Sequence, residues 1–248
     1  MSETTEDGFL GGRITLRQPA KGYRAGVDPV LLAAAVDARA GQSVLELGTG
    51  VGTALICLGT RVPGLDLVGI ELQEDLAALA RENLSRNGQS GEVLTGDISS
   101  LPEDIRQKTF DHVIANPPYF QGGDGSLSAN ESRETGRRET TPLSVWIDVA
   151  TRRLAPKGSL TMIQRAGRLQ DVLSALDNRI GNISVTPIAP RIGRKAELVL
   201  VSGKKGGRGD LVLNAPFVMH DGAAHDGDRD SYTKAAKAIL RDGAALTT

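Results

Sequence analysis

The sequence predicts an α/β fold with a mostly parallel, seven-stranded sheet, helices on both faces of the sheet and a C-terminal antiparallel hairpin. Between residues 43 and 179, short apolar runs typical of buried strands alternate with segments of helical periodicity. Short connections between such elements favour a parallel, doubly wound sheet. Two further β-like runs, 183–189 and 196–202, face each other across Pro190 to Lys195 and predict the hairpin.

Each element of this alternation has a local signal. The helix expected from residue 28 has Asp28 as its N-cap and Pro29 at its first position. The helix expected at 75–87 has an apolar face and ends before Gly88, a typical C-cap residue. The expected strands are 43–47, 66–70, 92–95, 111–115 and 158–164. The expected helices are 28–36, 53–61, 75–87, 142–154 and 169–179.

The segments outside the alternation are shorter. Residues 9–18 predict a strand pair around Gly11 and Gly12, and residues 211–213 and 217–219 predict a second pair. Residues 120–141 are poor in apolar side chains and predict a loop, whereas about 232–240 is expected to form a terminal helix. The predicted organisation is a disordered N-terminus at 1–8, a single domain at 9–220 that begins with a distinct segment at 9–36, and a flexible connection with a C-terminal helix at 221–248.

The composition is that of an ordinary globular domain, with 40% hydrophobic and 24% charged residues among 248. The net charge of -1 means that a nucleic-acid partner must be held by a local basic patch. Cys57 is the single cysteine, which excludes a disulfide within the chain and favours a reducing cytoplasm. We expect a soluble protein without a membrane partner, because no stretch approaches the roughly 20 apolar residues of a membrane helix. His112, His220 and His225 lack metal-ligand spacing, so no metal site is expected.

A glycine-rich turn follows the first strand of the alternation. Gly48, Gly50 and Gly52 let the backbone pass close to a ligand where a Cβ atom would collide. A dinucleotide fingerprint requires its third glycine at position 53, which is Thr53, so the spacing disfavours NAD. The alternative is a tight strand-to-helix turn that binds no ligand.

Polar side chains also follow the next strands, and parallel strands bind ligands beyond their carboxyl ends. Glu71 ends the second strand, where its carboxylate is suited to accept both hydroxyls of a ribose. After the third strand, Asp97 is suited to an adenine amine and Ile98 to the face of the ring. Glu46 precedes the glycine turn and is suited to an ammonium group. Each of these carboxylates alone is equally compatible with a solvated surface position, but together they predict a nucleoside-binding pocket.

The fourth strand runs into the turn Asn116-Pro117-Pro118-Tyr119. The prolines fix the backbone and remove N–H donors, which leaves carbonyl oxygens as acceptors. The Asn116 side chain and the Pro117 carbonyl are suited to accept the two hydrogens of an adenine amine, whose nitrogen is otherwise a poor nucleophile. Tyr119 offers a ring on which a flipped base stacks. The alternative is a rigid turn that only ends a strand.

Together, the segment from Glu46 to Gly52, Glu71, Asp97 and the 116–119 turn resemble the class I methyltransferases of the amine-modifying (N/D)PP(Y/F/W) group, over roughly residues 24–165. The stretch from Gly11 to Leu32 is similar to the bacterial family that includes the valine-tRNA adenine-N6 methyltransferase. This resemblance implies a Rossmann-like fold, S-adenosylmethionine as cofactor and methyl transfer to an adenine N6 amine in tRNA. It also implies that segment 9–36 covers the methionine end of the cofactor.

The expected site residues follow from the motifs and from the resemblance, which implies that Tyr23 and Asp28 lie near the cofactor pocket. We expect Asn116, Pro117, Pro118 and Tyr119 to be catalytic. The expected cofactor-binding residues are Tyr23, Asp28, Glu46, Gly48, Thr49, Gly50, Gly52, Glu71, Leu72, Asp97, Ile98 and Asn116.

Basic residues predict the nucleic-acid surface. Residues 191–208 contain six cations against the single acid Glu197, and residues 152–168 contain five more without an acid. Phosphate contacts of this kind give affinity without reading sequence, although a solvated basic face is the alternative. The loop after Tyr119 matches the family's charged segment only loosely. The expected nucleic-acid contacts are Arg133, Arg137, Arg138, Arg191, Arg194, Lys195, Lys204, Lys205 and Arg208.

Other functions remain open from the sequence. A protein methyltransferase that modifies a glutamine amide requires the same turn, but the 43 residues before Val44 leave little room for a helical substrate domain. A non-catalytic nucleic-acid-binding module would have no use for an intact cofactor turn. A nicotinamide oxidoreductase would leave the 116–119 turn without a role. The target nucleotide, the RNA species and the oligomeric state are not determined by the sequence.

Overall fold

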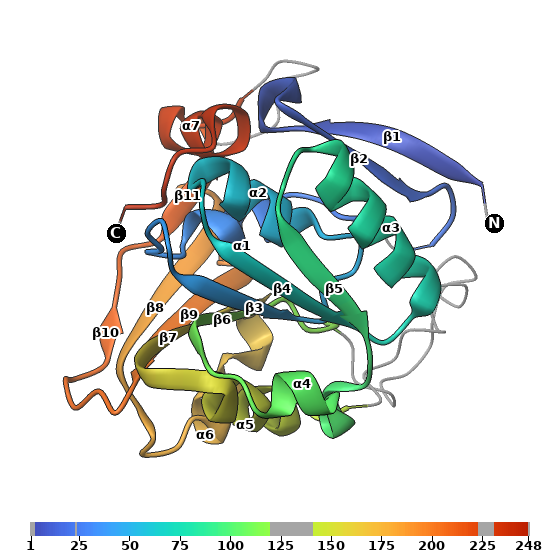
Figure 1. The fold of residues 1–248 in the computed structure, drawn as a ribbon. Helices are drawn as coiled ribbons and strands as arrows, with labels where there is room; N and C mark the ends of the chain where they lie inside the picture. Colours follow the sequence, from blue (N-terminus) through green and yellow to red (C-terminus); the bar gives the residue numbers. More distant parts are fainter. Residues whose placement is uncertain (1–2, 23, 120–140, 223–230, 248) are drawn as a thin grey trace, which may run out of the picture.

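The computed structural model describes residues 3–22, 24–119, 141–222 and 231–247. Its centre is a nine-stranded sheet in the order β10–β8–β9–β7–β6–β3–β4–β5, with β11 also paired to β8 (Figure 1). Strands β3 to β7 are mutually parallel, which confirms the predicted parallel part of the sheet. They comprise β3 (Ser43–Leu47), β4 (Asp66–Glu71), β5 (Gly91–Thr95), β6 (Phe110–Ala115) and β7 (Leu154–Arg165).

The predicted antiparallel hairpin is also present, and it completes the seven-stranded core of the sheet. It is formed by β8 (Ile180–Arg191) and β9 (Leu198–Lys205), which pair antiparallel, and β9 in turn pairs antiparallel with β7. In register, Ile188 lies opposite Leu198, and Leu198 lies opposite Arg165. The β8–β9 turn therefore lies at the carboxyl edge of the parallel strands.

The predicted pairing between 211–213 and 217–219 is wrong. Strands β10 (Val212–Leu213) and β11 (Phe217–His220) both pair with β8 in parallel. The connecting residue Asn214 donates its backbone N–H to the Val185 carbonyl, and its side chain donates to the Ser184 and Thr186 hydroxyls. These bonds keep the chain running along β8 rather than turning back on itself.

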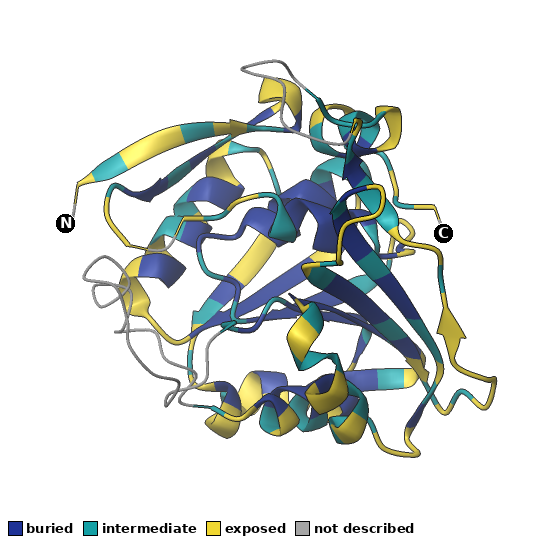
Figure 2. Ribbon diagram, turned by 180° about the vertical axis from the view of Figure 1, so that it is seen from behind, coloured by how far each residue is buried: buried dark blue, intermediate teal, exposed yellow. Residues whose placement is uncertain are grey.

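Helices cover both faces of the sheet (Figure 1). Along β3, Val44 packs into one core and Leu45 into the other, as the alternation of side chains in a strand requires. In Figure 2 the strands are largely buried, whereas the helices expose their outer faces. The first core includes residues of α1 (Asp28–Ala34), α2 (Thr53–Arg61), α3 (Glu74–Arg86) and α7 (Lys234–Asp242), and the second includes residues of α4 (Glu103–Arg106), α5 (Leu143–Arg153) and α6 (Leu169–Ala175).

The expectation of a disordered N-terminus at 1–8 is wrong for the described residues. Strand β1 (Thr4–Phe9) pairs antiparallel with β2 (Ile14–Pro19), and the short helix η1 (Leu10–Gly12) joins them. The predicted strand pair around Gly11 therefore exists, but its first strand lies earlier in the chain. The polar composition of this segment was misleading because two of its three acids form ion pairs: Asp7 with Arg24 at 2.6 Å and Glu6 with Arg86 at 2.6 Å.

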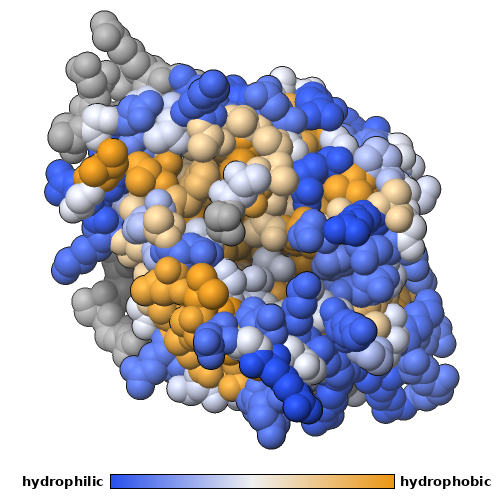
Figure 3. Space-filling model, turned by 90° about the vertical axis from the view of Figure 1, so that its left-hand side faces the viewer, coloured by the Kyte–Doolittle hydropathy of each residue, from blue (hydrophilic) through white to orange (hydrophobic). Residues whose placement is uncertain are grey.

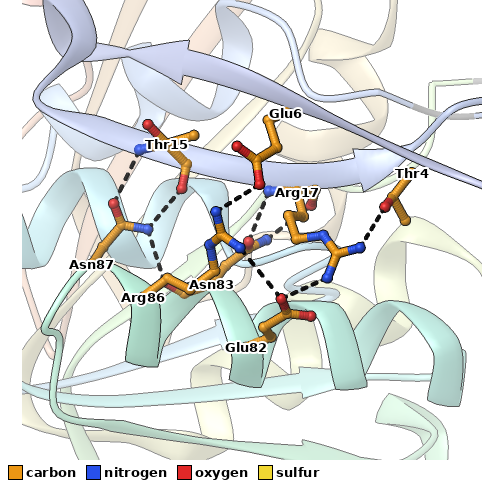
Figure 4. A network of polar contacts seen from close by, with 8 residues as sticks. All are labelled: Thr4, Glu6, Thr15, Arg17, Glu82, Asn83, Arg86 and Asn87. Atoms are coloured by element: carbon orange, nitrogen blue, oxygen red, sulfur yellow. Dashed lines mark hydrogen bonds and ion pairs between the residues drawn. The ribbon is translucent and has the colours of Figure 1, made fainter.

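Strand β2 is held against the domain by asparagine side chains of α3 (Figure 4). The Asn83 side chain accepts the Arg17 N–H at 2.8 Å and donates to the Arg17 carbonyl at 3.0 Å. Asn87 makes the equivalent pair of bonds with Thr15. Asn83 also donates to the Val51 carbonyl at 2.9 Å. The side chains of Asn83 and Asn87 therefore satisfy backbone groups of β2 as a neighbouring strand would. Asn83 also links β2 to the glycine-rich turn.

The C-terminal helix α7 packs against the N-terminal part of the chain. It begins after Thr233, whose hydroxyl accepts the Ala236 N–H at 3.1 Å. Arg13 donates to the Asp242 carbonyl at 2.7 Å, and the Leu246 N–H donates to the Ala34 carbonyl at 2.8 Å. The expected terminal helix is therefore present and docked.

Candidate active site

The glycine-rich turn between β3 and α2 has a left-handed backbone at each of its glycines. The φ angles of Gly48, Gly50 and Gly52 are 67°, 57° and 87°, which favours glycine over residues with a Cβ. A Cβ at Gly48 would lie 2.6 Å from the Trp146 ring, whereas one at Gly50 would meet nothing within 4 Å. Gly48 is thus required for packing, and Gly50 borders open space that a ligand can enter.

Glu71 braces this turn from the end of β4. One carboxylate oxygen accepts the Gly50 N–H at 2.9 Å and the other accepts the Gln73 N–H at 2.9 Å. Glu71 is buried, yet each oxygen retains a lone pair beyond the bond it accepts. The carboxylate is therefore held in place with acceptor capacity left for ribose hydroxyls. The next residue, Leu72, is 60% exposed and offers an apolar surface beside it.

Glu46 lies under the turn in a buried position. The Thr49 hydroxyl donates to its carboxylate at 2.6 Å. Burial raises the pKa of Glu46 to about 8, against the smaller opposing effect of the Thr49 hydrogen bond. A buried carboxyl with a raised pKa gains most from a cationic ligand, because the cation stabilises the ionised form.

Asp97 and Ile98 follow β5, as predicted. Asp97 is exposed and accepts the Ser99 N–H at 2.8 Å, which starts the short helix η2 (Ile98–Ser100). Ile98 is buried in the core beneath. The Asp97 carboxylate has a second oxygen available to a ligand, whereas Ile98 contributes mainly to packing.

The 116–119 turn follows β6, which lies beside β3 in the sheet. Pro117 is buried, and Asn116, Pro118 and Tyr119 are half-buried. The Tyr119 hydroxyl donates to the Asp28 carboxylate at the start of α1. Asp28 is therefore placed against the 116–119 turn, and it anchors Tyr119 from outside the sheet.

Arg165 lies over the same tyrosine. Its guanidinium carbon is 5.6 Å from the centroid of the Tyr119 ring, within the range of a cation–π contact. Sequence reasoning noted the basic run that contains Arg165 but did not select this residue. The available signal was its position just after the predicted strand 158–164, which puts it at the same edge as Glu71 and Asn116.

The predicted basic surface is divided between two edges of the sheet. Arg194 and Lys195 are exposed in the β8–β9 turn at the carboxyl edge. Lys204 lies opposite Ser159, toward the amino edge of the sheet. Six residues of strand separate Lys204 from Leu198, which places Lys204 roughly 20 Å from the β8–β9 turn. Lys205 and Arg208 follow Lys204 and share its edge. The structure therefore does not bring these last three residues to the candidate site.

Local contacts also engage two cations of the basic surface, Arg191 and Lys205. The buried Arg191 side chain donates to the Asp221 carbonyl and, at 3.3 Å, to the Ser231 hydroxyl. Lys205 donates to the Leu154 carbonyl at 2.6 Å. Four predicted site residues lie outside the described residues: Tyr23, Arg133, Arg137 and Arg138.

The family of the chain follows from a match to a sequence model described as a methyltransferase small domain, over residues 25–188. The chain belongs to this family and is an S-adenosylmethionine-dependent methyltransferase. Relatives named tRNA1(Val) (adenine(37)-N6)-methyltransferase include one from Porphyromonas gingivalis, 36% identical over 67% of this chain and 68% of the relative. Another, from Haemophilus influenzae, is 26% identical over 95% of this chain and 97% of its own length.

Solved structures show the same fold. A predicted O-methyltransferase from Agrobacterium tumefaciens superposes with a TM-score of 0.70 at 25% identity, over 89% of this chain and 99% of the other. The Thermus thermophilus 16S rRNA N2 G1207 methyltransferase, in complex with AdoMet and guanosine, superposes with a TM-score of 0.58 at 19% identity over 82% of this chain and 50% of the other. These likenesses agree with the parallel sheet and the C-terminal hairpin.

The residues at the carboxyl ends of β3 and β4 fit S-adenosylmethionine. Open space at Gly50, free acceptor capacity on Glu71 and the buried Glu46 carboxyl match a backbone approach, a ribose and an ammonium group. Within the described ranges, no helix has the length and apolarity needed to cross a membrane. In the same ranges, no group of three or more histidine, cysteine or acidic side chains is arranged to hold a metal ion.

Proposed function

We propose that this chain transfers the methyl group of S-adenosylmethionine to the exocyclic N6 amine of an adenine in tRNA. The observation that carries the proposal is the position of the Asn116–Tyr119 turn. It follows β6 at the carboxyl edge, next to the glycine-rich turn that follows β3. The names of the curated relatives support the choice of tRNA and adenine.

The chemistry requires that the adenine amine becomes nucleophilic. When bound, S-adenosylmethionine would supply an electrophilic methyl group on a sulfonium, whose sulfur would leave as a neutral thioether. The Asn116 side-chain oxygen and the Pro117 carbonyl accept the two amine hydrogens, which favours a tetrahedral nitrogen with an available lone pair. After the methyl transfer, the amine nitrogen releases its surplus proton to water. No strong base is needed, because alignment and preorganised acceptors lower the barrier.

Tyr119 positions the target base. A flipped adenine stacks on its ring, and the hydroxyl bond to Asp28 fixes the ring plane. Because Asp28 begins α1, the N-terminal segment is coupled to the substrate half of the site. Phosphate contacts from Arg194 and Lys195 add affinity at the same edge. A tRNA substrate also implies that the enzyme works in the cytoplasm.

The cofactor half is assigned to the remaining pocket residues. Glu71 would accept the ribose hydroxyls, Asp97 the adenine amine, and Glu46 would face the ammonium group directly or through water. Leu72 would lie against the adenine ring.

The proposal is tested by incubating the protein with labelled S-adenosylmethionine and separate RNA, DNA and protein fractions from cells. We expect the label in small RNA, and nucleoside analysis is expected to find it as N6-methyladenosine. Label in the protein fraction alone would favour glutamine-amide methylation instead. Failure to bind S-adenosylmethionine in calorimetry would favour a non-catalytic binding module.

A further inference from the structure

The turn between β8 and β9 carries an exposed isoleucine at its tip. Ile192 is 80% exposed, and Gly193 follows it with a φ angle of 73°. A single exposed apolar side chain is common on protein surfaces. The location of Ile192 and the charged residues beside it indicate that this side chain has a role in binding.

The turn projects beyond the carboxyl edge of the sheet. Leu198 and Ile188 lie level with Arg165, at the end of β7, and Ile192 lies four residues further on. In the sheet, β8 is three strands away from β6, which corresponds to about 14 Å. A stacked strand of nucleic acid rises 3.4 Å per nucleotide, so about four nucleotides span this distance. Ile192 thus lies within reach of an RNA strand bound at Tyr119.

The described surface between Tyr119 and Ile192 carries more positive than negative charge, with Glu197 as an exposed acid just before β9. Arg194 and Lys195 are exposed in the turn itself. Arg165, which contacts the Tyr119 ring, is exposed at the end of β7. An RNA strand that leaves the Tyr119 site therefore meets positive charge along its phosphates.

The turn is also preorganised. The Arg191 side chain is anchored to the Asp221 carbonyl and to the Ser231 hydroxyl. The Arg194 N–H donates to the Arg191 carbonyl at 3.1 Å, and the Glu197 N–H donates to the Ile188 carbonyl at 3.0 Å. Arg191 consequently acts as a support for the turn, and little ordering is required when a ligand binds.

We propose that the β8–β9 turn docks the RNA strand that leaves the target adenine, with Ile192 packed against the face of a base about four nucleotides away and Arg194 and Lys195 on the phosphates beside that base. This inference rests on the proposed function. An apolar side chain inserted at a base step holds the step open. A contact this far from the flipped base adds to the affinity for RNA and fixes which adenine reaches Tyr119, and it does not act on the transfer step itself.

The test uses an RNA stem-loop substrate that the wild-type enzyme methylates, and two altered proteins, Ile192→Ser and Arg194→Ala/Lys195→Ala. Matched controls come from the same chain. Leu213→Ser removes another exposed apolar side chain, 66% exposed on β10. Strand β10 lies on the left in Figure 1, the side of the molecule that faces the viewer in Figure 3. Lys204→Ala/Arg208→Ala removes two exposed cations from the opposite edge of the sheet.

We expect Ile192→Ser to raise the KM for RNA about tenfold while kcat and cofactor affinity stay unchanged. With 2-aminopurine placed at successive positions near the target adenine, wild-type binding is expected to increase the fluorescence at one position, and Ile192→Ser to remove that increase. Arg194→Ala/Lys195→Ala is expected to reduce the slope of log affinity against log salt by about 1.4. Both controls are expected to behave as wild type.

A KM for Ile192→Ser within twofold of wild type, with the fluorescence change intact, would overturn the inference while leaving the proposed function in place. A larger effect of the Lys204→Ala/Arg208→Ala control would also overturn it. If the wild-type enzyme methylates no RNA, the proposed function itself fails, and that outcome is separate because it needs no variant.

Discussion

The two edges of the central sheet use similar residues in different ways. At the amino edge, the Asp111 carboxylate accepts the Ser43 N–H at 2.9 Å and the Ser43 hydroxyl at 3.0 Å, and Lys205 donates to the Leu154 carbonyl. These bonds join one stretch of chain to another. At the carboxyl edge, the Glu71 carboxylate also braces the backbone, but it borders open space at Gly50 and keeps acceptor capacity.

This difference separates polar residues that hold the fold from those that bind ligands. A polar group whose bonds are all made within the chain contributes to stability, and its removal leaves partners unsatisfied. A polar group that is fixed by one set of bonds and open on another side is prepared for a ligand. Changes at the amino edge should therefore lower stability, and changes at the carboxyl edge should lower binding or turnover.

The largest effect is expected at the 116–119 turn, for which we propose the catalytic role. Asn116→Ala removes one of the two acceptors for the amine hydrogens, and kcat for methyl transfer is expected to fall about 100- to 1,000-fold. Cofactor affinity and the melting temperature should change little, because Asn116 is half-buried in a turn fixed by two prolines. Single-turnover transfer to unmodified tRNA is the measurement. Robust activity in this variant would contradict the mechanism.

The next effect is on cofactor binding. Glu71→Ala removes the ribose acceptor and the brace on Gly50, and the Kd for S-adenosylmethionine is expected to rise about 100-fold. Asp66→Ala is the matched control, because Asp66 is an exposed carboxylate at the opposite end of the same strand. Calorimetry compares the two variants. An equal loss of affinity for S-adenosylmethionine in both variants would show that cofactor binding does not depend on the carboxyl edge of the sheet.

A pH dependence follows from Glu46. Its pKa of about 8 leaves the carboxyl neutral at pH 6, and pairing with an ammonium group requires the ionised form. Cofactor affinity is therefore expected to rise from pH 6 to pH 8, by nearly tenfold per unit, and then to level off. Because the folded pKa lies above the unfolded value, the stability of the cofactor-free protein should fall as the pH rises through about 8.

Glu46→Gln is the control for this dependence. It keeps an acceptor for the Thr49 hydroxyl and has no titrating proton, so affinity and stability should lose their slope between pH 6 and pH 8. Calorimetry and thermal unfolding across that interval measure both quantities. An unchanged slope in Glu46→Gln would assign the dependence to another group.

The smallest effect is expected at the amino edge. Asp111→Ala removes two hydrogen bonds to Ser43 and should lower the free energy of unfolding by about 1–2 kcal/mol, with kcat unchanged. These hydrogen bonds lower the pKa of Asp111. Their contribution is therefore present at neutral pH and is lost as the pH falls through the lowered pKa. Chemical unfolding at pH 7 and at acid pH checks this, and a loss of activity without a loss of stability would contradict it.

The parts of the molecule that the sequence predicted well depend on local pattern. Gly48, Gly50 and Gly52 mark a left-handed turn that the sequence itself reveals. The carboxyl ends of parallel strands lie at one edge of the sheet, and this alone predicts that Glu71, Asp97 and Asn116 lie at the same edge. The parts that were predicted poorly depend on distant partners. Strand β1 is ordered by contacts such as Arg86 with Glu6, 80 residues apart.

The basic run 191–208 shows that the charge pattern of the sequence cannot assign residues of one hairpin to an edge of the sheet. Residues 191–208 are continuous in sequence, but they begin at the β8–β9 turn and run along β9, so the two ends of the run lie at opposite edges of the sheet. The charge pattern alone could not separate Arg194 from Lys204, since only the pairing register assigns each to an edge. Similarly, the spacing of Asn83 and Asn87 places them on one helix face, but their partner β2 lies far away in the sequence.

The central claim is that the carboxyl edge, through the 116–119 turn, methylates an adenine amine in tRNA. The most direct measurement is mass spectrometric nucleoside analysis of unmodified tRNA after incubation with S-adenosylmethionine and either the wild-type protein or Asn116→Ala. The expected result is N6-methyladenosine with the wild-type protein and almost none with the variant. A methyl group on any other nucleoside, or equal N6-methyladenosine with both proteins, would contradict the claim.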